Sequence, residues 1–490
     1  MSIPAILVSM TLGTMGFQNY SDPVPVDPNL HPSDEFFVVD SADRIHVLYE
    51  PRSGPHRLRT SVDAGDSWIE RPNLPSFGRS GEALALAADP LDPGVLYLGT
   101  RHVTQNWADV TQVRVSRDGG ESWEDPWTLE QSGASDAYET CMAQSPESRA
   151  LAVAWRTWPG GIRIGHSTDQ GRTFSSPLTV DPLGDHLLGL GYTADDALVC
   201  VYGINDVWQG WSAHARRSQD NGRTWSDPVE LISLPYVTYV WAADVLTMAD
   251  TVHAAWADES SVRHSMSTDG GRTWASASLA GSEESSGVSL VRPTGSNQVL
   301  LSYVNTLGYR DLWQHSWRSG AWSPQRRIAN RIGEVLRSAG LASDSQGRTF
   351  ACYSTDHLHP VASRVVVSRS DPHRPVDVGV HLHDDSNFLF ADPGDPVAID
   401  LVVTNWGAVD ATVDLWIQAR GASGFSARRQ FSKQLLISGG ETLPLRLTGR
   451  IPASTPADRY DLSVHAGSIG PPKKTDDSDG FITWIGSGQK

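Results

Sequence analysis

The sequence predicts an all-β protein in two parts: a seven-bladed β-propeller over residues 1–374, closed by its N-terminal strand, and a β-sandwich over residues 375–490. An octapeptide of the form Ser-x-Asp-x-Gly-x-Ser/Thr-Trp/Phe carries the first part of this prediction. Its copies start at Ser61, Ser116, Ser167, Ser218 and Ser267. Successive starts lie between 267 − 218 = 49 and 116 − 61 = 55 residues apart, close to the length of a four-stranded propeller blade. After residue 375 this period stops, and short segments with alternating apolar residues follow.

Each octapeptide has the composition of a tight hairpin turn, as in Ser267 to Trp274. The Asp carboxylate can accept hydrogen bonds from backbone N–H groups at the tip, and the Gly can take the positive φ that such a turn requires. The Trp or Phe then anchors the returning strand in the core. Inner strands are expected to begin near Glu35, Glu82, Tyr138, His186, Tyr239, Val288 and Val335.

The octapeptide resembles the Asp-box, or bacterial neuraminidase (BNR) repeat, of sialidase-like propellers, and five full copies carry the resemblance. In that family the box is structural and lies on the propeller face away from the catalytic centre. The resemblance therefore implies an architecture and a candidate ligand face opposite the turns. A fold of this kind does not by itself imply the chemistry.

Two decayed copies extend the period to seven units. One begins at Ser316 without the Asp, and the other begins at Ser368 without the Gly and Trp. The outer-strand signature that follows a box, as in Thr224 to Val229, is missing after Ser368, but Asn19 to Val24 supplies it. We expect this N-terminal segment to complete the last blade, because such closure removes a free sheet edge. An unrelated Asp-Pro turn is the alternative.

The segment after residue 375 alternates apolar and polar residues with a period of two between Gly, Pro and Asn turns, as in a small sandwich. It resembles the immunoglobulin-like accessory domains of bacterial surface and secreted proteins over residues 376–487. That resemblance favours an extracellular or cell-surface location. No signal peptide is readable in the apolar start of the chain, so the sequence leaves the compartment open.

The formal charge of −18 disfavours nucleic acid and anionic membranes as partners. The sequence contains no run of about 18 apolar residues, so it does not predict membrane insertion. Cys141, Cys200 and Cys352 fall in separate repeats within apolar runs, which favours buried thiols over disulfides or a metal site. We expect neither a metal nor a cofactor.

The candidate ligand face combines guanidinium, aromatic and carboxylate side chains from strand ends and loops. The residues predicted to bind ligand are Arg52, Arg79, Glu82, Arg101, His102, Tyr138, Arg156, Trp208, Tyr239, Arg310, Arg337, Asp356 and His357. A wider set at the same strand ends and loops adds His56, Asp136, Glu139, Trp158, Asp185, His186, Asp206, Trp211, Asp258, Glu259, Tyr309, Asp311, Glu334 and His359. Arg forks bind carboxylates and aromatic rings stack on sugars, so an acidic or otherwise polar glycan is the expected ligand, with a protein partner also open. The competing interpretation is a generally polar face whose Arg side chains pair with neighbouring Asp and Glu.

The resemblance to sialidases would also imply an Arg triad, a Tyr nucleophile activated by Glu and an Asp acid. The Arg-Ile-Pro motif that carries the first Arg is absent ahead of the first box and occurs only at Arg450 to Pro452. The inner strand from Glu334 to Leu341 contains no Tyr. We therefore favour binding without sialidase chemistry and assign no catalytic residue. A carbohydrate-active enzyme is the alternative, either a divergent sialidase-like hydrolase or a lyase that would use His102, Tyr138, His186, Tyr239 and Arg337.

Overall fold

The chain is described by a computed structural model in which every regular element is a β-strand. No candidate membrane-spanning helix occurs in the described residues. These are residues 7–8, 24–27, 32–51, 55–72, 74, 82–103, 109–132, 137–157, 161–206, 210–234, 240–258, 261–281, 285–305, 312–318, 320–322, 326–329, 334–357, 364–370, 378–382, 388–392, 396–405, 410–421, 426–438, 442–451, 458–468 and 474–485.

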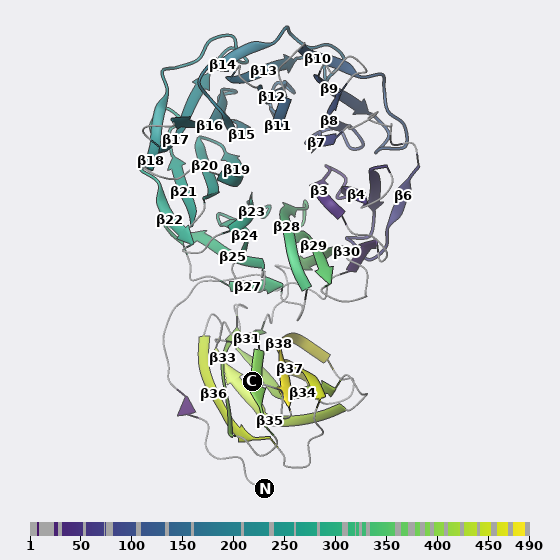
Figure 1. Ribbon diagram of the computed structural model, residues 1–490, viewed down its shortest axis with the longest axis vertical. Coiled ribbons are helices and arrows are strands. Elements are labelled where there is room, and N and C mark those ends of the chain that lie inside the picture. Colours follow the sequence, from purple (N-terminus) through teal and green to yellow (C-terminus); the bar gives the residue numbers. More distant parts are fainter. Residues whose placement is uncertain are drawn as a thin grey trace.

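Six antiparallel sheets, each built from strands that are consecutive in the sequence, belong to a β-propeller (Figure 1). The strands of the first three sheets are β3 (Pro32–Val39), β4 (Ile45–Pro51), β5 (Arg57–Ser61), β6 (Ile69–Arg71), β7 (Glu82–Ala88), β8 (Leu96–Val103), β9 (Asp109–Ser116), β10 (Trp127–Ser132), β11 (Ala137–Gln144), β12 (Leu151–Thr157), β13 (Gly161–Ser167) and β14 (Leu178–Asp181). Those of the next three are β15 (His186–Tyr192), β16 (Leu198–Asp206), β17 (Gly210–Ser218), β18 (Val229–Leu234), β19 (Val240–Met248), β20 (Thr251–Asp258), β21 (Val262–Ser267), β22 (Ser278–Gly281), β23 (Ser285–Val291), β24 (Val299–Asn305), β25 (Leu312–Arg318), β26 (Ala321–Trp322) and β27 (Arg326–Ala329).

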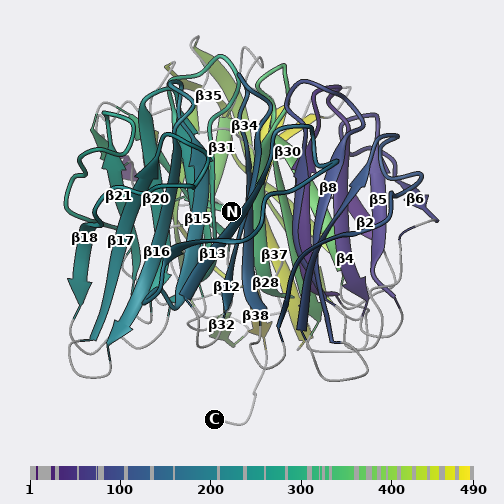
Figure 2. The same ribbon diagram turned by 90° about the horizontal axis from the view of Figure 1, so that it is seen from above.

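The first strand of each sheet lies innermost in the propeller (Figure 1), and Figure 2 shows the strands running from one face to the other. Together with β28 (Glu334–Ser343), the inner strands begin within three residues of the positions that the sequence predicts. The hairpins that join the third and fourth strands all lie at one end of the sheets. We call that end the octapeptide face, and the other end the opposite face.

A further sheet combines residues from the two ends of this part of the chain. Its strand order is β2-β30-β29-β28, with β2 (Val24–Asp27), β29 (Thr349–His357) and β30 (Arg364–Ser370). Strand β2 pairs antiparallel with β30, Val24 opposite Val367. Of the predicted strand from Asn19 to Val24, only Val24 lies within the described residues. In Figure 1, β28 to β30 lie between β25 and β4.

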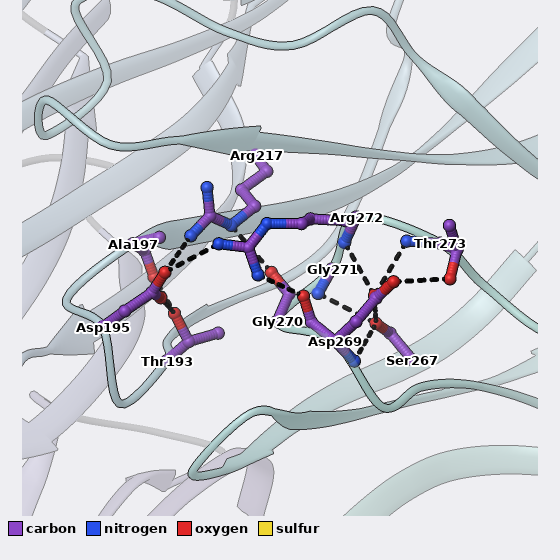
Figure 3. Close-up of polar contacts among 10 residues, drawn as sticks. All are labelled: Thr193, Asp195, Ala197, Arg217, Ser267, Asp269, Gly270, Gly271, Arg272 and Thr273. Atoms are coloured by element: carbon purple, nitrogen blue, oxygen red, sulfur yellow. Dashed lines mark hydrogen bonds and ion pairs between the residues drawn. The ribbon is translucent and has the colours of Figure 1, made fainter.

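The five octapeptides share one hydrogen-bond pattern. In the copy that starts at Ser267, the Gly271 N–H donates to Ser267 Oγ at 2.8 Å (Figure 3). The N–H and the hydroxyl of Thr273 donate to the two oxygens of Asp269 at 2.8 and 2.6 Å. Gly270 and Gly271 have φ of 73° and 84°, and the equivalent two positions have positive φ in every copy. Two successive left-handed residues suit the twist of a tight hairpin, which explains the fixed Gly.

Arginines join neighbouring sheets at the octapeptide face. The guanidinium of Arg117 donates to the backbone oxygen of Gln170 at 3.1 Å, and that of Arg217 donates to Gly270 at 2.9 Å. Arg369 makes the equivalent contact with Ala64 at 3.4 Å. In all three cases the acceptor is the fourth residue of an octapeptide. Arg217 also pairs with Asp195 of its own sheet (Figure 3).

The core of the propeller lies between adjacent sheets. Trp155, Trp211 and Trp256 are fully buried, each on the second or third strand of its sheet. One cluster, for example, packs Trp211 against Trp256 of the next sheet, with ring centroids 6.1 Å apart. Burial of one such ring contributes about 4 to 6 kcal/mol before its conformational entropy is subtracted. The aromatic content of the repeats therefore stabilises the contacts between sheets.

Side chains of inner strands also accept hydrogen bonds from the next inner strand. The N–H of Leu290 donates to Asp244 at 2.8 Å, and the N–H of Leu341 donates to Ser289 at 2.9 Å. Asp244 is half-buried, and desolvation raises its pKa to about 6 against the effect of its hydrogen bonds. Inner strands are sheet edges, so their free N–H groups need such partners.

The residues after 375, together with Leu7–Val8, form two further sheets. One has the order β1-β36-β33-β31 and the other β32-β38-β37-β34-β35. Their strands are β1 (Leu7–Val8), β31 (Val378–Leu382), β32 (Phe388–Ala391), β33 (Pro396–Asn405), β34 (Ala411–Gly421), β35 (Ser426–Ile437), β36 (Thr442–Arg450), β37 (Asp458–Ser468) and β38 (Lys474–Ile485). One buried cluster takes Leu401 and Leu445 from the first sheet and Val413 and Leu415 from the second. The strand at Leu7–Val8 pairs with β36, so a segment from the start of the chain belongs to this second unit.

Candidate functional site

The structure describes the side chains of two of the thirteen residues that the sequence predicts to bind ligand. Arg101 and Arg156 lie near the ends of β8 and β12, on the opposite face. Glu82, His102, Tyr138, Arg337, Asp356 and His357 lie in strands, but their side chains fall outside the described part of the chain. Arg52, Arg79, Trp208, Tyr239 and Arg310 lie outside the described residues altogether.

A cluster of charged and polar side chains surrounds Glu139 on the opposite face. Glu139 Oε1 lies 3.2 Å from His186 Nδ1 and 3.8 Å from Arg156 Nη1. Glu139 Oε2 accepts the backbone N–H of Leu187 at 2.6 Å. We call Glu139, Arg156, Asp185 and His186 the Glu139 cluster. It joins the sheets of β11–β14 and β15–β18 at the end of their inner strands.

A β-bulge aims the Glu139 side chain at the neighbouring sheet. Tyr138 pairs with Arg156 and Thr140 with Trp155, so Glu139 has no partner in the ladder between β11 and β12. Its φ is 39°, in a region that non-glycine residues rarely adopt. Such backbone strain persists only where surrounding contacts hold it, and it is common at functional sites. The contacts to His186, Leu187 and Arg156 hold it here.

The bulge also interrupts the regular alternation of side chains along β11. Strict alternation along β11 would point Tyr138 and Glu139 to opposite faces of the sheet. The extra residue breaks that alternation at Glu139. Glu139 and His186 belong to the wider predicted set, but their contact between sheets was not predicted.

Asp185 adds a second carboxyl group with a different environment. Burial raises its pKa above the usual range against the lowering effect of the nearby His186 and Arg156, and the Glu139 carboxylate raises it further. Asp185 Oδ1 accepts the backbone N–H of Asn205 at 2.9 Å. The cluster therefore combines two carboxyl groups, a guanidinium and an imidazole within one half-buried site.

Asp258, also in the wider predicted set, has a structural role. It is fully buried and accepts hydrogen bonds from the Ser261 hydroxyl at 3.0 and 3.1 Å and from Arg263 Nε at 2.5 Å. Its carboxylate is thus used within the turn between β20 and β21, which excludes it as a ligand-binding group. Within the described ranges, no three His, Cys, Asp or Glu side chains are grouped as metal ligands would be.

No protein-family model matches the chain, and no curated protein does. Solved structures with a similar fold include a protein of unknown function from Dyadobacter fermentans, with 15% identity, a TM-score of 0.45, and coverage of 73% of this chain and 99% of the other. A Hadza microbial sialidase has 17% identity and a TM-score of 0.39, with coverage of 67% and 76%. The polysaccharide lyase Uly1 has 10% identity and a TM-score of 0.49, with coverage of 72% and 99%. Similarity at this level assigns neither an activity nor a ligand to this chain.

Proposed function

We propose that this protein binds a polar glycan at its opposite face, and that the Glu139 cluster is part of the binding site. The observation that carries the proposal is the carboxylate of Glu139, held by a strained bulge between a guanidinium and an imidazole of two sheets. Carboxylate, guanidinium and imidazole groups together supply hydrogen-bond acceptors and donors in fixed positions, which is what recognition of sugar hydroxyl and carboxylate groups requires. His186 is 13% exposed and Glu139 is 35% exposed, so both can meet a ligand.

The proposal includes a seven-bladed propeller in which β2-β30-β29-β28 is the seventh blade and β2 closes it. Three contacts across this junction support it: Ser345 with Asp43, Arg369 with Ala64, and Arg59 with Val26. A closed propeller holds the strand ends of the opposite face in fixed positions. The predicted residues Arg101 and Arg156 then belong to one ligand-binding face together with the other eleven.

We further propose that residues 375–490 are an immunoglobulin-like sandwich that serves as a spacer or attachment domain, at the cell surface or outside the cell. The buried cluster shared by its two sheets supports the sandwich. The Asp-box identity of the octapeptides is supported by the hydrogen-bond pattern common to all five copies.

Glycan binding can be tested on a panel of acidic and neutral oligosaccharides with the full chain. We expect at least one class to bind, and Arg156→Ala and Glu139→Gln to weaken that binding tenfold or more. Arg172→Ala is the matched control, because Arg172 is an exposed arginine of the octapeptide face. Binding of no oligosaccharide, or an equal loss in Arg172→Ala, would contradict the proposal.

An enzyme acting on the same glycan is the second candidate function. Asp185 and Glu139 favour it, because a carboxyl group whose pKa is raised beside a second, hydrogen-bonded carboxylate is the arrangement that acid–base catalysis requires. Product formation in the same panel decides between the two. Turnover that disappears in Asp185→Asn while binding persists would establish the enzyme.

A further inference from the structure

The contact between Glu139 and His186 determines which imidazole nitrogen carries hydrogen. A carboxylate only accepts hydrogen bonds, so the nitrogen that faces it must donate. His186 Nδ1 is that nitrogen, at 3.2 Å from Glu139 Oε1. In the neutral imidazole, Nε2 is then left with a lone pair and is an acceptor.

Glu139 is itself held firmly enough to impose this tautomer. Its second oxygen accepts the Leu187 N–H at 2.6 Å, and Leu187 directly follows His186 in β15. Both carboxylate oxygens of Glu139 therefore contact adjacent residues of β15, one the ring of His186 and the other the backbone of Leu187. Arg156 lies 3.8 Å from the oxygen that faces His186 and balances its charge.

Nothing in the described part of the chain hydrogen-bonds to His186 Nε2, although the ring is largely buried. His186 Nε2 is therefore an acceptor without a hydrogen-bond donor in the described part of the chain. It can accept a hydrogen bond from an O–H or N–H group of a ligand. Sugars present mainly hydroxyl groups.

We propose that His186 recognises a hydroxyl group of the bound sugar by accepting its hydrogen bond at Nε2, with Glu139 as the positioning residue that fixes the tautomer. This inference rests on the proposed glycan binding and makes it specific, because a sugar that lacks this hydroxyl loses the contact. One hydrogen bond of this kind is worth roughly tenfold in affinity, which sets the size of the expected discrimination.

The tautomer can be measured without any ligand. In two-bond ¹H–¹⁵N correlation spectra of the full chain labelled with ¹⁵N-histidine, we expect His186 to carry its hydrogen on Nδ1 at neutral pH. Glu139→Ala should shift His186 toward the Nε2–H form, and the signals of His253 and His264 should not change. A hydrogen on Nε2 in the unsubstituted protein would overturn the inference.

The recognised hydroxyl can be found with monodeoxy derivatives of the sugar that binds. We expect one derivative to bind the unsubstituted protein about tenfold more weakly than its parent. His186→Asn should bind parent and derivative equally, since its amide can still donate to Glu139 but has no group at the Nε2 position. Glu139→Ala should also lose the preference for the parent sugar, because the tautomer of His186 is no longer fixed.

The outcomes separate this inference from the proposed function. If no glycan binds while the Nδ1–H tautomer is present, glycan binding is wrong and the hydroxyl contact falls with it. If a glycan binds but His186→Asn keeps the full preference for the hydroxyl, the role of His186 is wrong and glycan binding stands.

Discussion

Asp43 and Ser345 lie 302 residues apart in the chain and share two hydrogen bonds. The Ser345 N–H donates to Asp43 Oδ1 at 2.7 Å, and the Ser345 hydroxyl donates to Asp43 Oδ2 at 2.7 Å. They join the turn between β3 and β4 to the turn between β28 and β29. Arg369 Nη1, 3.1 Å from Asp66, joins the same two sheets. The proposed closure of the propeller can therefore be tested at this junction.

Replacing Val26 with Ala should destabilise the protein. Val26 is 1% exposed and packs in a cluster with Ile45, Val365 and Val367 from both sides of the junction. Loss of two buried carbon atoms and the cavity left behind should lower the free energy of unfolding by about 2 kcal/mol. Urea denaturation measures it.

The matched control is Val62→Ala, because Val62 is 62% exposed in the neighbouring octapeptide. We expect a change within about 0.5 kcal/mol there. Equal effects of the two substitutions would show that β2 does not pack at this junction.

Replacing Asp269 with Ala should remove the hydrogen bonds that define its turn. Removing a charged acceptor of the Thr273 N–H and hydroxyl should cost about 1 to 3 kcal/mol. Thr268→Ala, at the exposed second position of the same octapeptide, should be nearly neutral. Thermal unfolding of both variants, compared with the unsubstituted protein, checks this expectation.

The same carboxylate should make the turn sensitive to acid. Burial alone would raise the pKa of Asp269, but hydrogen bonds from the Thr273 hydroxyl and backbone outweigh it and lower the pKa to about 2. The folded pKa lies below the unfolded value of about 3.9, so the stabilisation is present above about pH 4 and is lost as pH falls toward 2. In Asp269→Ala this contribution to the pH dependence should be missing.

The buried pair His253 and His264 should destabilise the folded protein in acid. Their nitrogens Nδ1 and Nε2 lie 2.9 Å apart, and burial lowers their pKa values to about 4 and about 3. Both values lie below the unfolded value of about 6.5, so the unfolded chain takes up protons first as pH falls below it. Stability is complete above about pH 6.5 and declines toward pH 4, by about 1.4 kcal/mol per pH unit for each proton.

A double variant, His253→Gln with His264→Gln, should show a shallower decline over this range. Chemical denaturation at a series of pH values, followed by the fluorescence of Trp317 and Trp322 that contact His264, measures both slopes. Parallel declines in the two proteins would contradict the assignment.

Gly271→Ala should cost more than Gly320→Ala, although both glycines hold the fifth position of an octapeptide or its decayed copy. Both have positive φ, 84° and 91°, so both substitutions strain the backbone by about 1 kcal/mol. A Cβ at Gly271 would also lie 2.8 Å from Val199 Cγ2, whereas at Gly320 no heavy atom lies within 4 Å. The difference between the two losses of unfolding free energy measures the steric part. Equal losses would mean that Val199 moves away freely.

The period of the octapeptides was enough to predict an all-β propeller and the start of each inner strand, because turn chemistry and strand alternation are local properties. Of the predicted outer strand from Asn19 to Val24, the described residues include only Val24, where β2 begins. The site was harder to predict. Contacts such as Glu139 with His186 join strands of different sheets. Which side chains meet between sheets depends on packing, which the repeat period does not specify.

Composition also could not distinguish ligand-facing carboxylates from structural ones. Asp258 and Asp185 both lie at strand ends of the opposite face. The carboxylate of Asp258 accepts hydrogen bonds from Ser261 and Arg263. Within the described residues, the carboxyl group of Asp185 accepts one only from the backbone of Asn205. The difference depends on the residues three and five positions beyond Asp258 and on how the turn folds back.

The contacts of Arg117, Arg217 and Arg369 bear on how this repeat family can diverge. Each arginine donates a hydrogen bond to a main-chain oxygen. The residues that carry this oxygen are Gln170, Gly270 and Ala64, whose side chains differ completely. The side chain at the acceptor position can therefore vary without loss of the contact. The unit at Ser368 lacks the Gly and Trp of the consensus, but its Arg369 still donates a hydrogen bond to Ala64 of the first octapeptide. A unit can thus lose the octapeptide consensus and still keep its hydrogen bond to the backbone of the neighbouring sheet.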